Sequence, residues 1–200
     1  MYTSAVRQTP TPRMRSLFAL EALLVFGIGA AAHFLFDAIG RWAPLAWTAP
    51  VNESLWEHIK MAFWPTLIVD WVLGAKLPTG RHRIVCTAMS ACVSTLLIAP
   101  LFYAYTGILG HHLLAADIAI FAIAVGAGHW LAYRVAVGPT PDDGAVVAAV
   151  LLAAALGLAL VVFTYRPPLM EVFRASLSGR YGLDLAAGDS PLQRVVGSEQ

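Results

Sequence analysis

The chain has 200 residues, of which 58% are hydrophobic and only 12% are charged, and its net charge at pH 7 is +1. Soluble domains carry about 25% charged residues, so this composition excludes an ordinary soluble domain and favours an integral membrane protein. A net charge so close to zero also gives no electrostatic basis for binding nucleic acid.

Five apolar stretches predict five membrane-spanning helices joined by short loops. A helix needs about 20 apolar residues to cross the hydrocarbon core of a bilayer. The stretches run over residues 17–39, 55–75, 85–104, 113–135 and 145–163. We therefore expect an all-α helical bundle, a single transmembrane domain over residues 17–165. A cytoplasmic segment, residues 1–16, precedes it, and an extracytoplasmic, partly disordered tail, residues 166–200, follows it.

The orientation follows from the positively charged residues of the loops, which gather on the cytoplasmic side of membrane proteins. The outer loops carry Arg41 alone. The segments on the other side carry Arg7, Arg13, Arg15, Lys76, Arg81, Arg83 and Arg134. The chain is therefore predicted to begin inside and to end outside.

The first apolar stretch has a second interpretation. Arg15, the apolar run and the Ala-Ala-Ala sequence at residues 30–32 resemble a secretory signal peptide with its cleavage site. Glu21, inside the run, counts against cleavage, because the central region of a signal peptide is apolar. If the segment were cleaved, His33 would become the new N-terminus.

Ionisable side chains on three predicted helices lie at a similar depth below the outer surface, given a helical rise of about 1.5 Å per residue. His33 and Asp37 share one face of the first helix, because they are four residues apart. The other members are Glu57, His58 and Lys60 on the second helix and Asp117 on the fourth. Polar groups within lipid favour the interior of a bundle, so we predict a common intramembrane polar site near the outer face.

The imidazole and carboxylate groups of this site are suitable ligands for a divalent metal such as zinc. The expected ligands are His33, Asp37, Glu57, His58 and Asp117. Lys60 counts against a ligand-rich metal pocket, because a nearby ammonium group competes with the cation. It favours an ion-paired network or an anionic head group instead. In an enzyme, Glu57, His58 and Lys60 would be the catalytic residues, with the metal activating water against a lipid-borne substrate.

The start of the second predicted helix also has a simpler explanation. Ser54 followed by Glu57 is the pattern of a capping box, and Asn52 is a good helix cap. Acidic residues near a first helical turn, Glu53 included, interact favourably with the helix dipole. Capping does not explain His58 or the polar groups on the other helices.

A second polar layer is predicted nearer the cytoplasmic face, where Glu21, Asp70 and His129 share a depth. A pair between Asp70 and His129 would join the second and fourth predicted helices as a structural contact. A proton relay is the alternative, since ionisable groups within a membrane are often functional.

Pro65 predicts a kink in the second helix, because it leaves the carbonyl of Met61 without its usual donor.

Several segments together resemble a known family. They are "HFLFD", "PVNESLWEHIKMAFWP", "YTGILG" with "DIAIF", and "FTYRPPLMEVFR" with "YG". They are similar to a family of small bacterial polytopic membrane proteins that is classed only as a domain of unknown function, with the signature PVNESxWEHxK. The resemblance covers most of the chain, from about Ala32 to Gly182.

This resemblance implies a multi-pass protein of the bacterial cell (inner) membrane. It also counts against signal-peptide cleavage, because the family pattern includes "HFLFD". By matching positions it points to His33, Asp37, Asn52, Glu53, Glu57, His58, Lys60 and Asp117, but it implies no catalytic role for any of them.

Three functions stay open at this point. The protein is an enzyme acting on a lipid-borne or membrane-soluble substrate, a proton- or cation-coupled transport component, or a non-catalytic membrane subunit. Membrane lipids are expected partners in each case, together with a second copy of the chain or another membrane protein. The residues do not decide whether the chain is an enzyme.

Overall fold

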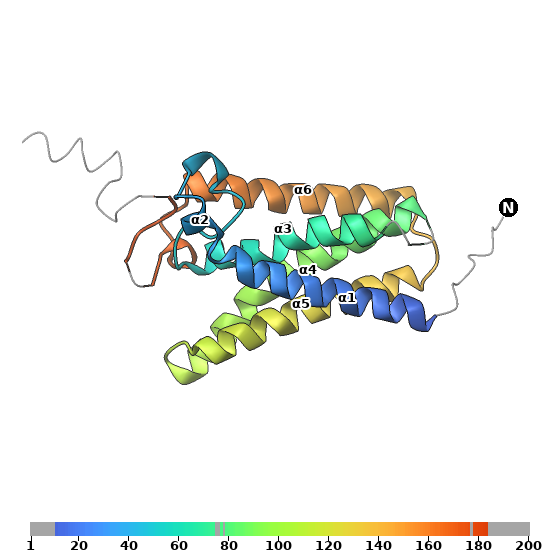
Figure 1. Cartoon of the computed structure of the whole chain (residues 1–200), viewed down its shortest axis with the longest axis horizontal. Coiled ribbons are helices and arrows are strands. Elements are labelled where there is room, and N and C mark those ends of the chain that lie inside the picture. Colours follow the sequence, from blue (N-terminus) through green and yellow to red (C-terminus); the bar gives the residue numbers. More distant parts are fainter. Residues whose placement is uncertain (1–10, 75–76, 78, 177, 184–200) are drawn as a thin grey trace, which may run out of the picture.

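Five long helices make up most of the structure, a computed structural model that describes residues 11–74, 77, 79–176 and 178–183. They are α1 (Pro12–Ala32), α3 (Leu55–Leu73), α4 (Gly80–Leu109), α5 (Leu114–Ala136) and α6 (Asp143–Tyr165). Near one end of the bundle lie the short helix α2 (Leu35–Ala38) and two 3₁₀ turns, η1 (Ala43–Leu45) and η3 (Glu171–Phe173) (Figure 1). The described residues form no strand, so the prediction of an all-α fold is confirmed.

The first helix differs from the predicted one at both ends. It begins at Pro12, because the side chain of Thr11 caps its first turn. It ends at Ala32 and does not continue to Ile39 as the apolar pattern predicted. His33 and Phe34 separate α1 from the short helix α2, and His33 and Asp37 line the same pocket.

The α4 helix is longer than the predicted stretch 85–104. Thr79 caps it ahead of the polar residues that begin it, and Gly110 ends it with a left-handed φ of 75°. Hydropathy detects only the apolar middle of such a helix, which explains the difference.

Two further predictions concern the ends of the chain. The predicted disorder of the tail concerns residues 184–200, and part of the predicted cytoplasmic segment is residues 1–10. Both ranges lie outside the described residues.

Four of the five long helices, α1, α4, α5 and α6, are long and apolar enough to cross a membrane. α3 is similar in length but carries three charged residues, Glu57, Lys60 and Asp70, all of them buried. It packs against α1, α4 and α6. The five predicted long helices are therefore present, and four of them have the composition of a membrane-spanning helix.

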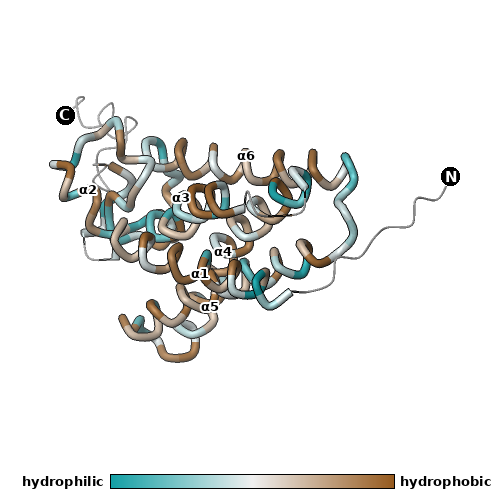
Figure 2. The backbone as a smooth tube through the Cα atoms, turned by 45° about the vertical axis from the view of Figure 1, so that its right-hand side comes forward, coloured by the Kyte–Doolittle hydropathy of each residue, from teal (hydrophilic) through white to brown (hydrophobic). Residues whose placement is uncertain are grey.

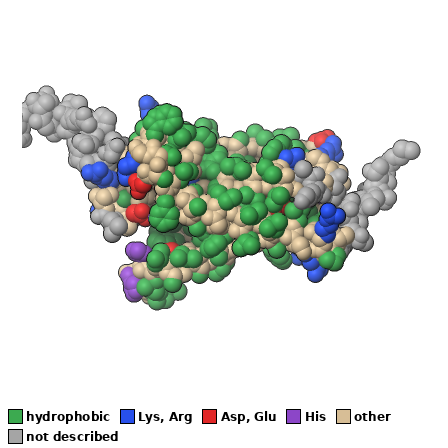
Figure 3. Space-filling model, viewed as in Figure 1, with side chains coloured by type: hydrophobic (Ala, Val, Ile, Leu, Met, Phe, Trp, Pro, Cys, Tyr) green, Lys and Arg blue, Asp and Glu red, His purple; other side chains and the backbone are tan. Residues whose placement is uncertain are grey.

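Side chains are distributed in the reverse of the way expected for a soluble protein. Leu23, Leu151 and Leu158 are 66%, 64% and 64% exposed, whereas Glu57 and Lys60 are 1% and 0% exposed. Hydrophobic residues cover the middle of the molecule, and charged ones gather toward its two ends (Figures 2 and 3). An apolar surface around a polar interior suits a lipid environment, in which a polar group outside the bundle would have no partner.

Close contact between α1 and α3 depends on Gly29. A Cβ atom at this position would lie 2.5 Å from the carbonyl oxygen of Met61 and 2.6 Å from the ring of Phe121. The carbonyl of Met61 is the one that Pro65, inside α3, leaves without its helical donor. Small residues at such crossings let membrane helices approach closely.

We expect Gly29→Ala to lower the free energy of unfolding by about 1–3 kcal/mol, because the added methyl group overpacks the contact between α1 and α3. Gly27→Ala is the matched control, since a Cβ at Gly27 meets no atom within 4 Å. Thermal unfolding of both variants in detergent measures the difference. Equal unfolding temperatures for the two variants would contradict this account of the helix crossing.

Candidate functional site

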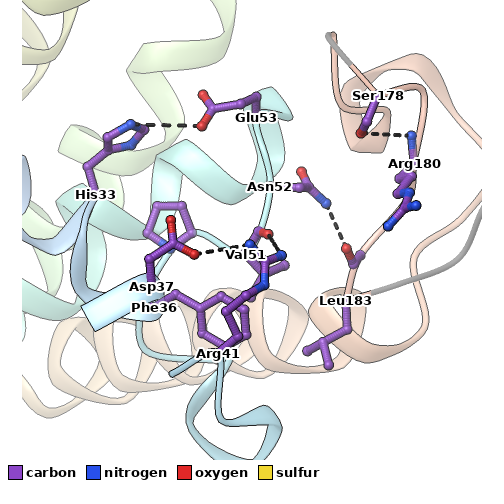
Figure 4. A pocket seen from close by; sticks show the side chains of 12 residues that line it. His33, Phe36, Asp37, Arg41, Val51, Asn52, Glu53, Ser178, Arg180 and Leu183 are labelled. Atoms are coloured by element: carbon purple, nitrogen blue, oxygen red, sulfur yellow. Dashed lines mark hydrogen bonds and ion pairs between the residues drawn. The ribbon is translucent and has the colours of Figure 1, made fainter. Parts of the chain in front are cut away.

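One end of the bundle carries a pocket of about 450 Å³. Three segments form it: the end of α1 with α2, the loop before α3, and the chain beyond η3 (Figure 4). The lining residues are His33, Phe36, Asp37, Arg41, Pro50, Val51, Asn52, Glu53, Ser178, Arg180, Gly182 and Leu183. The pocket therefore combines imidazole, carboxylate and guanidinium groups.

Two histidines meet one carboxylate beside this pocket. His33 Nε2 lies 3.8 Å from Glu53 Oε1, and His58 Nε2 lies 3.3 Å from Glu53 Oε2. The two imidazole rings are 5.2 Å apart between centroids. Each residue offers one ligand atom, and these atoms lie within 4.8 Å of one another. Among the described residues, this is the group whose geometry suits a metal ion.

The start of α3 positions two members of the cluster. Ser54 is the N-cap: its hydroxyl accepts from the N–H of Glu57 at 3.3 Å. Asn52 Oδ1 in turn accepts from the N–H of Ser54 at 2.8 Å. The predicted capping box is thus half formed, since Asn52 takes the place expected for the Glu57 carboxylate. Glu53 lies between the two capping residues, outside the helix, and turns toward His58 in the first helical turn.

A backbone carbonyl fixes which nitrogen of His58 carries a hydrogen. His58 Nδ1 lies 2.8 Å from the carbonyl oxygen of Ser54, which can only accept. In the neutral ring Nε2 therefore has a lone pair, and this lone pair faces the carboxylate of Glu53, also an acceptor. Either a second ring proton or a cation must separate the two groups. Carbonyl-oriented histidines of this kind are common around metal ions.

Electrostatics keep Glu53 ionised in the cluster without a bound cation. The hydrogen bond with His58 and the charges of His58 and His33 lower the pKa of Glu53 below its ordinary value, although partial burial opposes them. The carboxylate is then ionised at neutral pH. His33 Nδ1 is buried and has no hydrogen-bond partner in the described part of the chain.

The distances fit a tetrahedral zinc site. Zinc binds histidine nitrogen and carboxylate oxygen at about 2.0–2.2 Å, which places neighbouring tetrahedral ligands roughly 3.4 Å apart. The separations at Glu53, 3.3 Å to Oε2 and 3.8 Å to Oε1, are close to this value, and one ligand atom from each of the three residues lies within 4.8 Å of the others. Two histidines and one carboxylate form a ligand set known from catalytic zinc sites, which keep a fourth position open. Because His33 and Glu53 line the pocket, a cation held there would be reachable from it.

The structure does not bring two of the predicted ligands to this cluster. Asp37 pairs with Arg41, whose Nη1 lies 3.0 Å from its Oδ1. Asp117 accepts from the hydroxyl of Tyr105 and lies 3.3 Å from His112 Nδ1. These residues belong to the hairpin of α4 and α5, whose turn projects away from the rest of the bundle (Figure 1). The predicted common site of the three helices is therefore divided.

Glu57, the third predicted ligand, forms a buried ion pair with Lys60 instead, 2.5 Å from Glu57 Oε2 to Lys60 Nζ. The same carboxylate oxygen accepts from the N–H of Val51 at 3.0 Å. Lys60 also donates to the carbonyl of Ala46 at 3.0 Å and to the hydroxyl of Thr164 at 2.9 Å. This network ties the loop before α3 and the end of α6 to α3. It satisfies both charges, so Glu57 and Lys60 hold the structure together here, and their catalytic roles stay a prediction.

Sequence reasoning missed Glu53 as a ligand, because its neighbours carry an obvious capping signal. That signal also places Glu53 just outside the helix, where its side chain is free to fold back onto His58. The position of Glu53 next to the helix cap could therefore have indicated its role. Thr164 was missed too, as one polar residue in the most apolar of the helices.

The inner polar layer forms a second buried cluster. His129 Nε2 lies 3.1 Å from Asp70 Oδ1, which joins α5 to α3 as the spacing predicted. Glu21 of α1 is buried as well, with 2% of its surface exposed. This cluster lies between the helices, away from the pocket at the end of the bundle.

The fold and these sites define a class of protein: an all-helical bundle with four helices suited to a membrane and with ionisable groups enclosed between them. The chain belongs to a family of unknown function (DUF6512), whose model matches residues 8–183. No curated protein and no solved structure matches it. Membership of a family of unknown function confirms the resemblance seen in the sequence. The function has to be inferred from the sites.

Proposed function

We propose that this chain is a multi-pass protein of the bacterial cell membrane that binds a divalent cation. The cation is zinc, and the protein uses it to hydrolyse a lipid-borne substrate. The ligands in this proposal are His33, Glu53 and His58. The observation that carries it is their convergence from the end of α1, the loop before α3 and the first turn of α3. The loop charges of the sequence predict that this end of the bundle faces outward.

Zinc bound to three protein ligands acts as a Lewis acid and activates water at neutral pH. The chain would orient the ligands and balance the charge of the cation. The carbonyl of Ser54 holds the His58 ring so that Nε2 faces the site, and the ionised Glu53 balances the charge of the cation. The pocket beside them gives a substrate access to the site from one side.

Two guanidinium groups in the pocket favour a substrate with an anionic group. Arg41 is held in place by Asp37, by the carbonyl of Val51 at 3.5 Å and by the ring of Phe36, 5.4 Å from its guanidinium carbon. Its φ of 55° lies in the left-handed region, which non-glycine residues rarely adopt. Arg180 lines the same pocket. Guanidinium groups bind phosphate and carboxylate in a bidentate manner, which suits a lipid head group.

Metal analysis of the detergent-purified protein tests the proposal. We expect close to one zinc per chain in the unaltered protein after zinc loading and dialysis, and little in His33→Ala. His112→Ala is the matched control, because this exposed histidine pairs with Asp117 outside the cluster and should leave the zinc content unchanged. Equal zinc in all three proteins, or none in any, would contradict the proposal.

One observation favours a second candidate function, that of a non-catalytic membrane subunit. Glu57 and Lys60, two of the predicted catalytic residues, are fully engaged in holding the loop and α6. A protein that remains free of metal yet unfolds cooperatively at high temperature would support this role. Its partner would then be another membrane protein or a second copy of the chain.

A further inference from the structure

A second ionisable cluster lies inside the bundle, remote from the pocket. Asp70 of α3, Ser90 of α4 and His129 of α5 are 3%, 0% and 1% exposed. His129 Nε2 lies 3.1 Å from Asp70 Oδ1, and the hydroxyl of Ser90 contacts Asp70 Oδ2. Three helices therefore contribute to one polar centre, enclosed within the apolar segments.

The hydrogen bonds at His129 require a proton between Nε2 and Asp70. Its Nδ1 lies 2.8 Å from the carbonyl oxygen of Val125, which can only accept, so Nδ1 carries a hydrogen. Nε2 faces a carboxylate oxygen of Asp70. A bare ring nitrogen and an ionised carboxylate are both acceptors, and they would not form this contact in a buried site without a proton between them. That proton resides on His129 or on Asp70.

We propose that Asp70 and His129 form a proton-binding site, which takes up one proton from solution and releases it again. In the protonated state the proton lies in the contact between Asp70 and His129. On release it leaves to solvent, and the neutral imidazole and the ionised carboxylate then no longer share a hydrogen bond, while the hydroxyl of Ser90 still donates to Asp70. Proton relays are one of the functions that such groups serve within a membrane bundle.

A row of buried side chains on α4 extends from this site toward the start of the helix. His82, Cys86, Ser90 and Ser94 follow one another at intervals of four residues, so they share one face. His82 Nδ1 lies 3.0 Å from the hydroxyl of Thr79, the N-cap. His82 Nε2 and Ser94 Oγ are buried without a hydrogen-bond partner among the described residues. The row spans about 12 Å from His82 to Ser90, and the thiol of Cys86 between them donates to the carbonyl of Ala132.

Other titratable groups face the site and have to be separated from it by experiment. Glu21 of α1 and Asp70 both lie within electrostatic reach of the Cys86 thiol on α4. His82 precedes Cys86 by one turn, and Arg83 contacts the carbonyl of Trp71, next to Asp70. Substitution of single residues must therefore show which group takes up the proton.

Infrared difference spectroscopy of the purified protein, titrated between about pH 5 and about pH 8, tests the proposal over the range in which imidazole titrates. Beyond the imidazole signals of the five other histidines, we expect one carboxyl signal and one imidazole signal that share a midpoint and belong to this pair. Both signals should disappear in Asp70→Asn, and the imidazole signal should disappear in His129→Gln. Glu53→Gln, at the other cluster, should keep them. Signals that persist in Asp70→Asn, or no titration at all, would overturn the proposal.

Ser90→Ala keeps the result decisive if Asp70→Asn fails to fold. This variant retains both titrating groups but removes one hydrogen bond to the carboxylate, so the shared midpoint should move. An unchanged midpoint would overturn the proposal. The zinc content should stay the same in all of these variants except Glu53→Gln, so the proton-binding site can fail independently of the metal site.

Discussion

Lys60→Met is expected to lower the free energy of unfolding by about 3–5 kcal/mol, because it leaves the buried carboxylate of Glu57 without its cation. Glu57 is 1% exposed, and Lys60 Nζ is 2.5 Å from it. The substitution also removes the donor to the carbonyl of Ala46 and to the hydroxyl of Thr164. Thermal and SDS-induced unfolding in detergent measure the loss.

Two control variants separate the charge from the volume of the side chain. The double variant Glu57→Gln with Lys60→Met removes both charges, so it should recover most of the lost stability. Arg81→Met breaks an ion pair with Asp143 in which the two side chains are 50% and 85% exposed. Exposed pairs contribute about 0–1 kcal/mol, so this change should be small. If Lys60→Met were no more harmful than Arg81→Met, the central role of the buried pair would be wrong.

The fold was largely predictable because long apolar runs in a sequence indicate membrane-spanning helices. Each of the five predicted stretches coincides with a long helix, although the first continues past the end of α1, and the Asp70–His129 contact followed from depth alone. The ends of α1 and α4 were not predictable in the same way. Helix ends depend on caps and on polar flanking residues, which hydropathy does not detect, as Thr11 and Thr79 show.

The candidate site was predictable only in part, because depth along a helix does not fix direction around it. His33 and His58 were expected together and lie together. Asp37 would have shared the face of His33 on a continuous helix, but α1 ends at Ala32 and α2 carries Asp37 to a different partner. Asp117 pairs with His112, and the hairpin of α4 and α5 diverges from the bundle there (Figure 1).

Glu53→Gln is expected to reduce the affinity for zinc by more than about 100-fold. Loss of a group that only orients a metal ligand already costs 10–100-fold in affinity, and Glu53 would be a ligand itself. Glutamine keeps the size of the side chain and a hydrogen-bond acceptor, but it removes the negative charge between His33 and His58. Competition with a chromogenic zinc chelator measures the affinity of the purified variant.

Asp37→Asn is the decisive comparison for this prediction. The sequence pattern favoured Asp37 as a ligand over Glu53, whereas the structure pairs Asp37 with Arg41 in the same pocket. Both substitutions remove one carboxylate charge from the pocket, so a general electrostatic attraction of zinc would weaken equally in the two variants. Direct coordination by Glu53 predicts unchanged affinity in Asp37→Asn. An equal loss in both variants would mean that the pocket attracts cations without a defined ligand set, and the zinc centre would then have to be abandoned.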